Sequence, residues 1–154
     1  MNQISPQPGP QEQFLSSSAD IVIYGGAAGG GKTYGLLLEP LRHINVKGFG
    51  AVIFRRTSPQ IRNEGGLWDT SEEIYPHVQG KPKESVLMWD FDKFGTSIKF
   101  AHLEHEKHKL DYQGAQIPLI EFDELTHFTE SQFFYLLSRN RSTCGIKQYI
   151  RSTT

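Results

Sequence analysis

The sequence has little of several features that would assign its class at once. It contains one cysteine in 154 residues, Cys144, which excludes an internal disulfide and a metal site built from a cysteine cluster. No apolar run approaches the roughly 18 residues that a transmembrane helix needs. The first residues lack the basic start and apolar core of a secretory signal peptide. The net charge of −1 excludes a chain-wide basic surface for nucleic acid. We therefore expect one soluble domain from a reducing compartment.

Glycine, by contrast, is concentrated in one place. Five of the 15 glycines fall between Gly25 and Gly31. Residues 26–33 read GAAGGGKT and fit the phosphate-binding pattern G-x-x-x-x-G-K-S/T. The apolar run Asp20–Tyr24 predicts a strand before this pattern, and the leucine-rich stretch Thr33–Ile44 predicts a helix after it, kinked near its proline. This strand–loop–helix context is the one a P-loop requires, and it disfavours a chance glycine-rich turn.

The spacing suits a loop that wraps a phosphate chain. Glycines let the backbone turn sharply and approach the phosphates, so that its N–H groups converge on their oxygens. We expect Lys32 to act in catalysis by reaching the β- and γ-phosphates, and the Thr33 hydroxyl to bind Mg²⁺. The residues expected to contact the nucleotide are Gly26, Ala27, Ala28, Gly29, Gly30, Gly31, Lys32 and Thr33.

A second half of the site is expected where the apolar run Leu119–Phe122 ends in Asp123 and Glu124. A strand through the core would bring Asp123 out at the carboxyl edge of the sheet, where it can hold Mg²⁺ beside Thr33. Glu124 would then polarise an attacking water as the general base. The alternative is that the two acids cap a helix. Period-two alternation puts Glu121 on the same side of the strand as Asp123.

The rest of the chain alternates strand and helix signals, which predicts an α/β fold with a mainly parallel sheet. Residues 1–13 are rich in Pro, Gln and Gly and predict an irregular arm. Ser58-Pro59 and the Thr129-x-x-Gln132 capping box predict helix starts. The other expected elements are strands Ala51–Phe54, Ile117–Phe122 and Gln148–Ser152, a hairpin of Ser85–Phe91 and Ser97–Leu103, and helices Leu67–Tyr75 and Phe133–Leu137.

Two groups of side chains have plain structural explanations. Trp68 and Trp89 are expected in the core rather than as platforms for stacking bases. His102, His105 and His108 stand among mixed charges at three-residue spacing. That pattern favours a solvated short helix over a metal cluster. We therefore expect neither group in the site.

Taken in order, the segments resemble the N-terminal ATPase domain of the large terminase subunit of tailed bacteriophages, the motor that packages DNA. The matching segments are GPQEQF, IVIYGGAAGGGKT, VIFRRT, YQGAQIPLIEFDELTHF, SRNRS and YIRSTT. A P-loop and an acidic pair alone would fit many nucleotide motors, and the ordered set is more specific. The resemblance implies a P-loop NTPase three-layer fold of the RecA/ASCE-like type over residues 20–154, preceded by an N-terminal arm, residues 1–19.

The resemblance also implies roles outside the two motifs. An upstream glutamine of the family reads the adenine edge, and Gln11 matches it best, with Gln13 as the alternative. An unstructured polar arm is the other interpretation of this segment. Ser152-Thr153-Thr154 resembles the coupling motif that senses the γ-phosphate and relays hydrolysis to movement. An ordinary threonine-rich strand end is the alternative there.

Phosphoryl transfer also needs an arginine to offset charge on the transferring group. The candidates are Arg55, Arg56, Arg62, Arg139, Arg141 and Arg151. The first two directly follow a strand, so they are expected at the ligand-binding edge of the sheet. Arg139 and Arg141 lie in a predicted loop from which they could reach a neighbouring subunit. Residues 139–151 carry four basic side chains and no acid, which predicts a local contact with DNA or another subunit.

The function favoured by this sequence is ATP hydrolysis, with Mg²⁺, that drives double-stranded viral DNA into a procapsid. The resemblance implies as partners DNA, a small terminase subunit, the portal protein and further copies in a ring, in the host cytoplasm and transiently at the portal vertex, with no membrane. Another RecA-like or helicase-like motor is the alternative, followed by a small-molecule kinase, in which the acidic pair would be unusual. A GTPase is disfavoured because no N-K-x-D segment is present.

The last residues predict that the sequence is part of a longer protein. YIRSTT reads as a strand, and a parallel α/β sheet rarely finishes on a strand. In the family, the coupling motif continues into Asn-Pro-Gly, and the large subunit carries a C-terminal nuclease domain. We therefore expect a chain truncated after the coupling-motif strand, with no DNA cleavage of its own.

Overall fold

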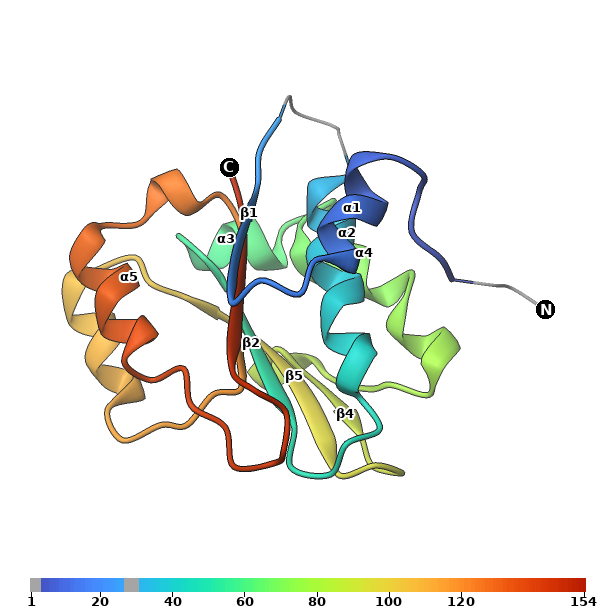
Figure 1. Ribbon diagram of the computed structural model, residues 1–154. Coiled ribbons are helices and arrows are strands. Elements are labelled where there is room, and N and C mark those ends of the chain that lie inside the picture. The colour runs from blue at the N-terminus through green and yellow to red at the C-terminus, as the bar shows by residue number, and fades with distance from the viewer. Residues whose placement is uncertain (1–3, 27–30) are drawn as a thin grey trace.

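A computed structural model describes residues 4–26 and 31–154, and a seven-stranded sheet crosses this part of the chain (Figure 1). The strand order is β1-β7-β6-β2-β5-β4-β3. The strands are β1 (Ile21–Tyr24), β2 (Gly50–Arg55), β3 (Lys81–Lys83), β4 (Met88–Phe91), β5 (Thr96–His102), β6 (Leu119–Phe122) and β7 (Tyr149–Thr153). The first five in the spatial order are parallel, and the last two are antiparallel. The predicted α/β class and mainly parallel sheet are therefore confirmed.

Helices cover both faces of the sheet and make three layers (Figure 1). The α-helices are α1 (Pro10–Ser16), α2 (Lys32–Leu38), α3 (Ser58–Arg62), α4 (Leu67–Glu72) and α5 (Glu130–Leu137). The 3₁₀ helices are η1 (Glu39–His43), η2 (Tyr75–Val78), η3 (Glu84–Val86), η4 (Glu106–Tyr112) and η5 (Leu125–His127). Alternation along β2 sends Ile53 into the core under α2 and α4, and Phe54 into the core under α5. The continuous apolar runs of the central strands follow from burial on both faces.

The N-terminal arm departs from the prediction. Residues 1–13 were expected to be irregular, but α1 begins at Pro10, a residue suited to the first turn of a helix. Its Phe14 is buried, and the Phe14 ring lies 5.1 Å from that of Tyr24 at the end of β1. This tertiary contact orders a segment whose composition alone predicts a loop.

Several element boundaries also differ from those expected, each for a local reason. Helix α2 ends at Leu38 and tightens into η1, because Pro40 has no N–H to continue an α-helical ladder. The helix expected over 67–75 ends at Glu72. Strand β4 begins at Met88 rather than at residue 85, because Leu87 before it has a left-handed backbone, with φ 52°. The capping box at Thr129 is confirmed.

The tryptophans and histidines lie as expected. Trp68 and Trp89 are 2% and 1% exposed, stack at 5.2 Å between ring centroids, and belong to the core. The Trp89 indole N–H donates to Ser71 Oγ at 2.9 Å. The histidines flank and enter η4, and the part of the chain that is described holds no metal-type cluster of His, Cys, Asp or Glu. In the same residues, no helix is long and apolar enough to cross a membrane.

We predict that Asn140 stabilises the junction between β6 and β7. Its buried Nδ2 donates to the carbonyls of Ile117, Pro118 and Tyr149 at 3.0, 3.1 and 3.2 Å. Asn140→Ala should lower the free energy of unfolding in urea by about 1–3 kcal/mol, because buried carbonyls lose their donor. The exposed Gln148→Ala should change it by less than about 0.5 kcal/mol. Equal effects of the two variants would contradict the prediction.

Candidate nucleotide-binding site

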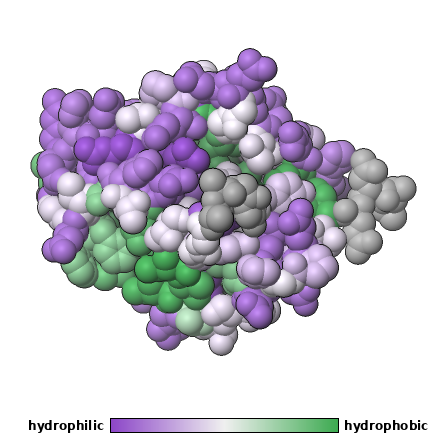
Figure 2. Space-filling model, turned by 90° about the horizontal axis from the view of Figure 1, so that it is seen from above, coloured by the Kyte–Doolittle hydropathy of each residue, from purple (hydrophilic) through white to green (hydrophobic). Residues whose placement is uncertain are grey.

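The residues singled out from the sequence meet at the carboxyl edge of the parallel strands. Chain segments leave this edge after β1, β2, β6 and β7, which are neighbours in the sheet (Figure 1). Figure 2 looks onto it from above and shows a largely hydrophilic surface, with an apolar patch on the side that faces the viewer in Figure 1. The carboxyl edge is where open α/β sheets bind their ligands.

Lys32 joins the two sides of the loop's mouth. The backbone of Gly26 has φ 142° and that of Gly31 has φ 75°, values that favour glycine, and α2 begins directly afterwards at Lys32. The Lys32 ammonium donates to the Gly26 carbonyl at 2.8 Å and also to the backbone oxygen of Thr154. Of the predicted phosphate-binding residues, Ala27, Ala28, Gly29 and Gly30 lie outside the described residues.

Asp123 is the centre of the site. It is 1% exposed, and its two carboxylate oxygens accept from three side chains that come from three different elements. Oδ2 accepts from Arg55 Nε at 2.7 Å and from the Thr33 hydroxyl at 3.3 Å. Oδ1 accepts from the Thr153 hydroxyl at 2.7 Å. A hydroxyl and a carboxylate that lie together in this way are hard oxygen ligands, and they fit the coordination chemistry of Mg²⁺.

Glu124 has an unusual backbone. Its φ of 60° and ψ of 62° are left-handed, a conformation that costs a residue with a side chain roughly 1–3 kcal/mol. The Glu124 N–H donates to the Thr153 hydroxyl at 2.9 Å, which fixes the turn. The acid precedes η5, but its side chain makes no capping hydrogen bond, so helix capping does not explain it. The side chain is half-buried, and it directly follows the residue that fits a metal.

Gln11 is held against the loop by α1. The side chain is 2% exposed, its Nε2 donates to the Gly31 carbonyl at 2.9 Å, and its Oε1 accepts from the Gln7 N–H at 2.6 Å. Gln13 is exposed to solvent. Of the two glutamines, the structure therefore brings only Gln11 to the loop.

The three residues of Ser152-Thr153-Thr154 have different surroundings. Thr153 bridges the acidic pair, as described above. Thr154 lies beside Gly25, since a Cβ added to that glycine would come within 3.2 Å of Thr154 Oγ1. Ser152 is fully buried, and its hydroxyl has no hydrogen-bond partner among the described residues. Only the resemblance drew attention to this segment, because a threonine-rich strand end has no chemical signature by itself.

The candidate arginines separate by position. Arg55 lies in the site as the partner of Asp123, a pairing that sequence reasoning missed although the strand end before Arg55 placed it at this edge. Arg56 donates to Gln132 Oε1 at 3.1 Å. The carbonyl of Arg139 accepts from the N–H of Ile117, which precedes β6, so the loop with Arg139 and Arg141 lies at the opposite edge of the sheet. Neither of those two reaches the site of its own chain.

Glu121 lies in the core below the site. It shares a face of β6 with Asp123, as expected, but it is fully buried, and its carboxyl oxygens have no hydrogen-bond partner among the described residues. Burial raises the pKa of Glu121 well above its ordinary value, and the nearby Glu39 carboxyl raises it further. The side chain therefore lines no part of the site's surface.

The family profile that matches this chain is that of terminase large subunits, T4likevirus-type, N-terminal, over residues 23–154. No curated protein sequence matches it. The large terminase of a thermophilic bacteriophage has a TM-score of 0.73 at 15% identity, over 96% of this chain and 39% of that one. The HK97 bacteriophage large terminase has a TM-score of 0.72 at 13% identity, over 100% of this chain and 34% of that one.

A third similar structure is the N-terminal domain of the DNA packaging ATPase from bacteriophage phi29, with a TM-score of 0.64 at 17% identity, over 94% of this chain and 77% of that one. The large terminase of the thermophilic bacteriophage is also known in complex with ADP and with ATP-gamma-S, where the TM-scores are 0.67 and 0.66. At these identities the likeness shows the fold. This chain spans less than two fifths of the length of the thermophilic phage protein and of the HK97 protein.

We predict that the Thr153 hydroxyl stabilises the site even without a ligand. Thr153→Val keeps the shape of the side chain but leaves Asp123 Oδ1 and the Glu124 N–H without their common partner. The variant should lose about 1–3 kcal/mol of unfolding free energy in urea. Thr153→Ser retains the hydroxyl and is the matched control. If serine and valine cost the same, the bridge does not stabilise the fold.

Proposed function

This chain belongs to the N-terminal, T4-like family of terminase large subunits, and on that premise we propose that it hydrolyses ATP to drive double-stranded viral DNA into a procapsid. The observation that carries the proposal is the contact of Thr33 with Asp123, which lie 90 residues apart in sequence. It joins the loop to the acidic pair at one edge of the sheet. The phi29 relative, a DNA packaging ATPase, and the nucleotide complexes of the thermophilic phage terminase support the same function.

In this proposal the residues divide the work on the phosphates. Residues 26–33 wrap the triphosphate, and Lys32 contacts the β- and γ-phosphates after giving up its present carbonyl partners. Thr33 and Asp123 would hold Mg²⁺, which offsets phosphate charge when it is bound. Glu124 accepts a proton from the attacking water as the general base. The fixed turn at Glu124 aims this base before substrate arrives.

Two further parts connect the base and the γ-phosphate to the machine. Gln11 reads the adenine edge, since its amide retains one free N–H and one free lone pair beyond the contacts with Gly31 and Gln7. Ser152-Thr153-Thr154 senses the γ-phosphate, and Thr153 relays the state of the acidic pair into β7. This contact is the route by which hydrolysis would move the sheet.

The working motor in this proposal is a ring of identical subunits around DNA, in the host cytoplasm and transiently at the portal vertex of the procapsid. The portal protein and a small terminase subunit are its partners. Arg55 and Arg56 are both engaged within the chain, whereas Arg139 and Arg141 are exposed. One of the latter two would act on the site of a neighbouring subunit, which makes hydrolysis depend on assembly.

The first test is ATPase activity with and without double-stranded DNA. Lys32→Ala should weaken nucleotide binding and turnover together, because Lys32 contacts the phosphates before and during reaction. Glu124→Gln should preserve affinity and lower turnover by about 10²–10⁴-fold, because it removes only the base. Undiminished hydrolysis in Glu124→Gln would exclude that role. DNA should stimulate the wild type, and stimulation by a small phosphoryl acceptor instead would indicate a kinase.

The second test concerns base selection. A side-chain amide can donate to adenine N7 and accept from the N6 amino group, whereas guanine presents an oxygen in place of that amino group. Gln11→Ala should therefore narrow the ratio of ATP to GTP affinity, by roughly 5- to 150-fold for a full bidentate pair. Gln13→Ala is the control on the exposed side of α1 and should leave the ratio unchanged. The opposite result would assign the role to Gln13.

A further inference from the structure

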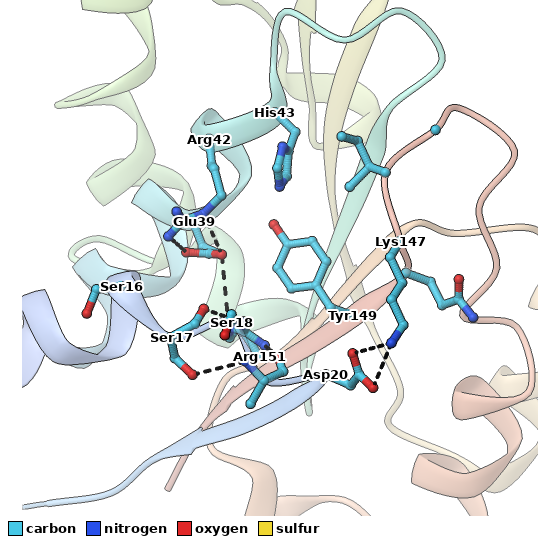
Figure 3. A pocket seen from close by; sticks show the side chains of 14 residues that line it. Ser16, Ser17, Ser18, Asp20, Glu39, Arg42, His43, Lys147, Tyr149 and Arg151 are labelled. Carbon is cyan, nitrogen blue, oxygen red and sulfur yellow. Dashed lines mark hydrogen bonds and ion pairs between the residues drawn. The ribbon is translucent and has the colours of Figure 1, made fainter.

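Arg151 makes contacts that neither the catalytic edge nor the core requires. It lies on β7 two residues before Thr153, is 2% exposed, and points toward the chain between α1 and β1 (Figure 3). Nη1 donates to the Ala19 carbonyl at 2.8 Å, and Nη2 donates to the Ser17 carbonyl at 3.0 Å. One guanidinium thus binds two backbone groups of a segment more than 130 residues away in sequence.

The segment that Arg151 binds has few other attachments. Residues 18–20 are exposed, and they border a cavity of about 370 Å³ rather than packed core (Figure 3). A side-chain tie beside it, the Asp20–Lys147 ion pair at 3.1 Å, is mostly exposed and contributes little. The Arg151 bonds are charge-assisted and excluded from water, which makes them the stronger attachment.

The surroundings of Arg151 fix its orientation. The guanidinium lies over the Tyr149 ring, 4.8 Å from the ring centroid. Its Nε is 3.9 Å from Glu39 Oε1, and Glu39 is itself held by Arg42 Nε at 3.2 Å. A buried positive charge that is stacked and paired in this way cannot turn to solvent without losing its partners. The fork is therefore aimed permanently at the Ser17 and Ala19 carbonyls.

We propose that Arg151 is a positioning residue that sets the base selectivity of the nucleotide site without touching the nucleotide. Helix α1 carries Gln11 to the Gly31 carbonyl, and the segment that follows α1 is clamped by Arg151. Strand β7 thus holds the base-reading arm through Arg151 and the acidic pair through Thr153. The inference rests on the proposed adenine role of Gln11, but the clamp itself does not depend on that role.

The test uses Arg151→Lys, which keeps a positive charge beside Glu39 but replaces the two-pronged fork with a single ammonium. Hydrogen exchange of the full chain without nucleotide should become faster in residues 10–16, with β6 as the internal reference. Glu39→Gln, a second variant that weakens the orientation of the fork, should shift α1 exchange in the same direction. Lys147→Ala is the matched control, because it removes the exposed tie on the same segment. Unchanged α1 exchange in both variants would overturn the clamp.

Nucleotide affinities then test the selectivity. In Arg151→Lys the ATP-to-GTP affinity ratio should fall toward that of Gln11→Ala, while GTP affinity stays within about twofold. The double variant should match Gln11→Ala alone, since residues that act through one contact are not additive. An unchanged ratio in Arg151→Lys, or additive losses, would overturn the positioning role. If Gln11→Ala itself leaves the ratio unchanged, the proposed adenine role fails, base selectivity by Arg151 fails with it, and exchange alone decides the clamp.

Discussion

A carboxylate taken out of water must be met by donors, and Asp123 is the buried carboxylate on which this site depends. Its partners Arg55, Thr33 and Thr153 come from the end of β2, the start of α2 and the end of β7. Satisfying one side chain therefore fixes the relative positions of four chain segments. The edge of the sheet is organised before any ligand arrives, which is what electrostatic catalysis of phosphoryl transfer needs.

Strand β7 carries a second buried charge at its other end. Period-two alternation puts Arg151 and Thr153 on the same face, so one strand contacts both the N-terminal arm and the acidic pair. Arg151 is balanced by Glu39, and its register partner Glu121 is fully buried without a hydrogen-bond partner among the described residues. Burying these groups costs free energy, so the core beneath the site is arranged for more than packing alone.

Much of this arrangement could be predicted from the sequence because the signals are local. The GAAGGGKT spacing, the apolar run before Asp123 and the capping box at Thr129 each lie within about ten residues, and each was found in its expected element. The arm was the failure. Its composition predicts a loop, but burial of Phe14 against Tyr24 stabilises α1, and no periodicity within the arm encodes a contact with a distant strand.

The sequence by itself determined the fold class, the loop and the acidic pair, because strand and helix periods and the phosphate-binding spacing are properties of neighbouring residues. Tertiary structure decided which side chains complete the site. It paired Asp123 with Arg55 and placed Gln11 rather than Gln13 at the loop. It also put the loop with Arg139 and Arg141 at the far edge of the sheet. Those contacts depend on the strand order, which brings together residues tens of positions apart and leaves no trace in local pattern.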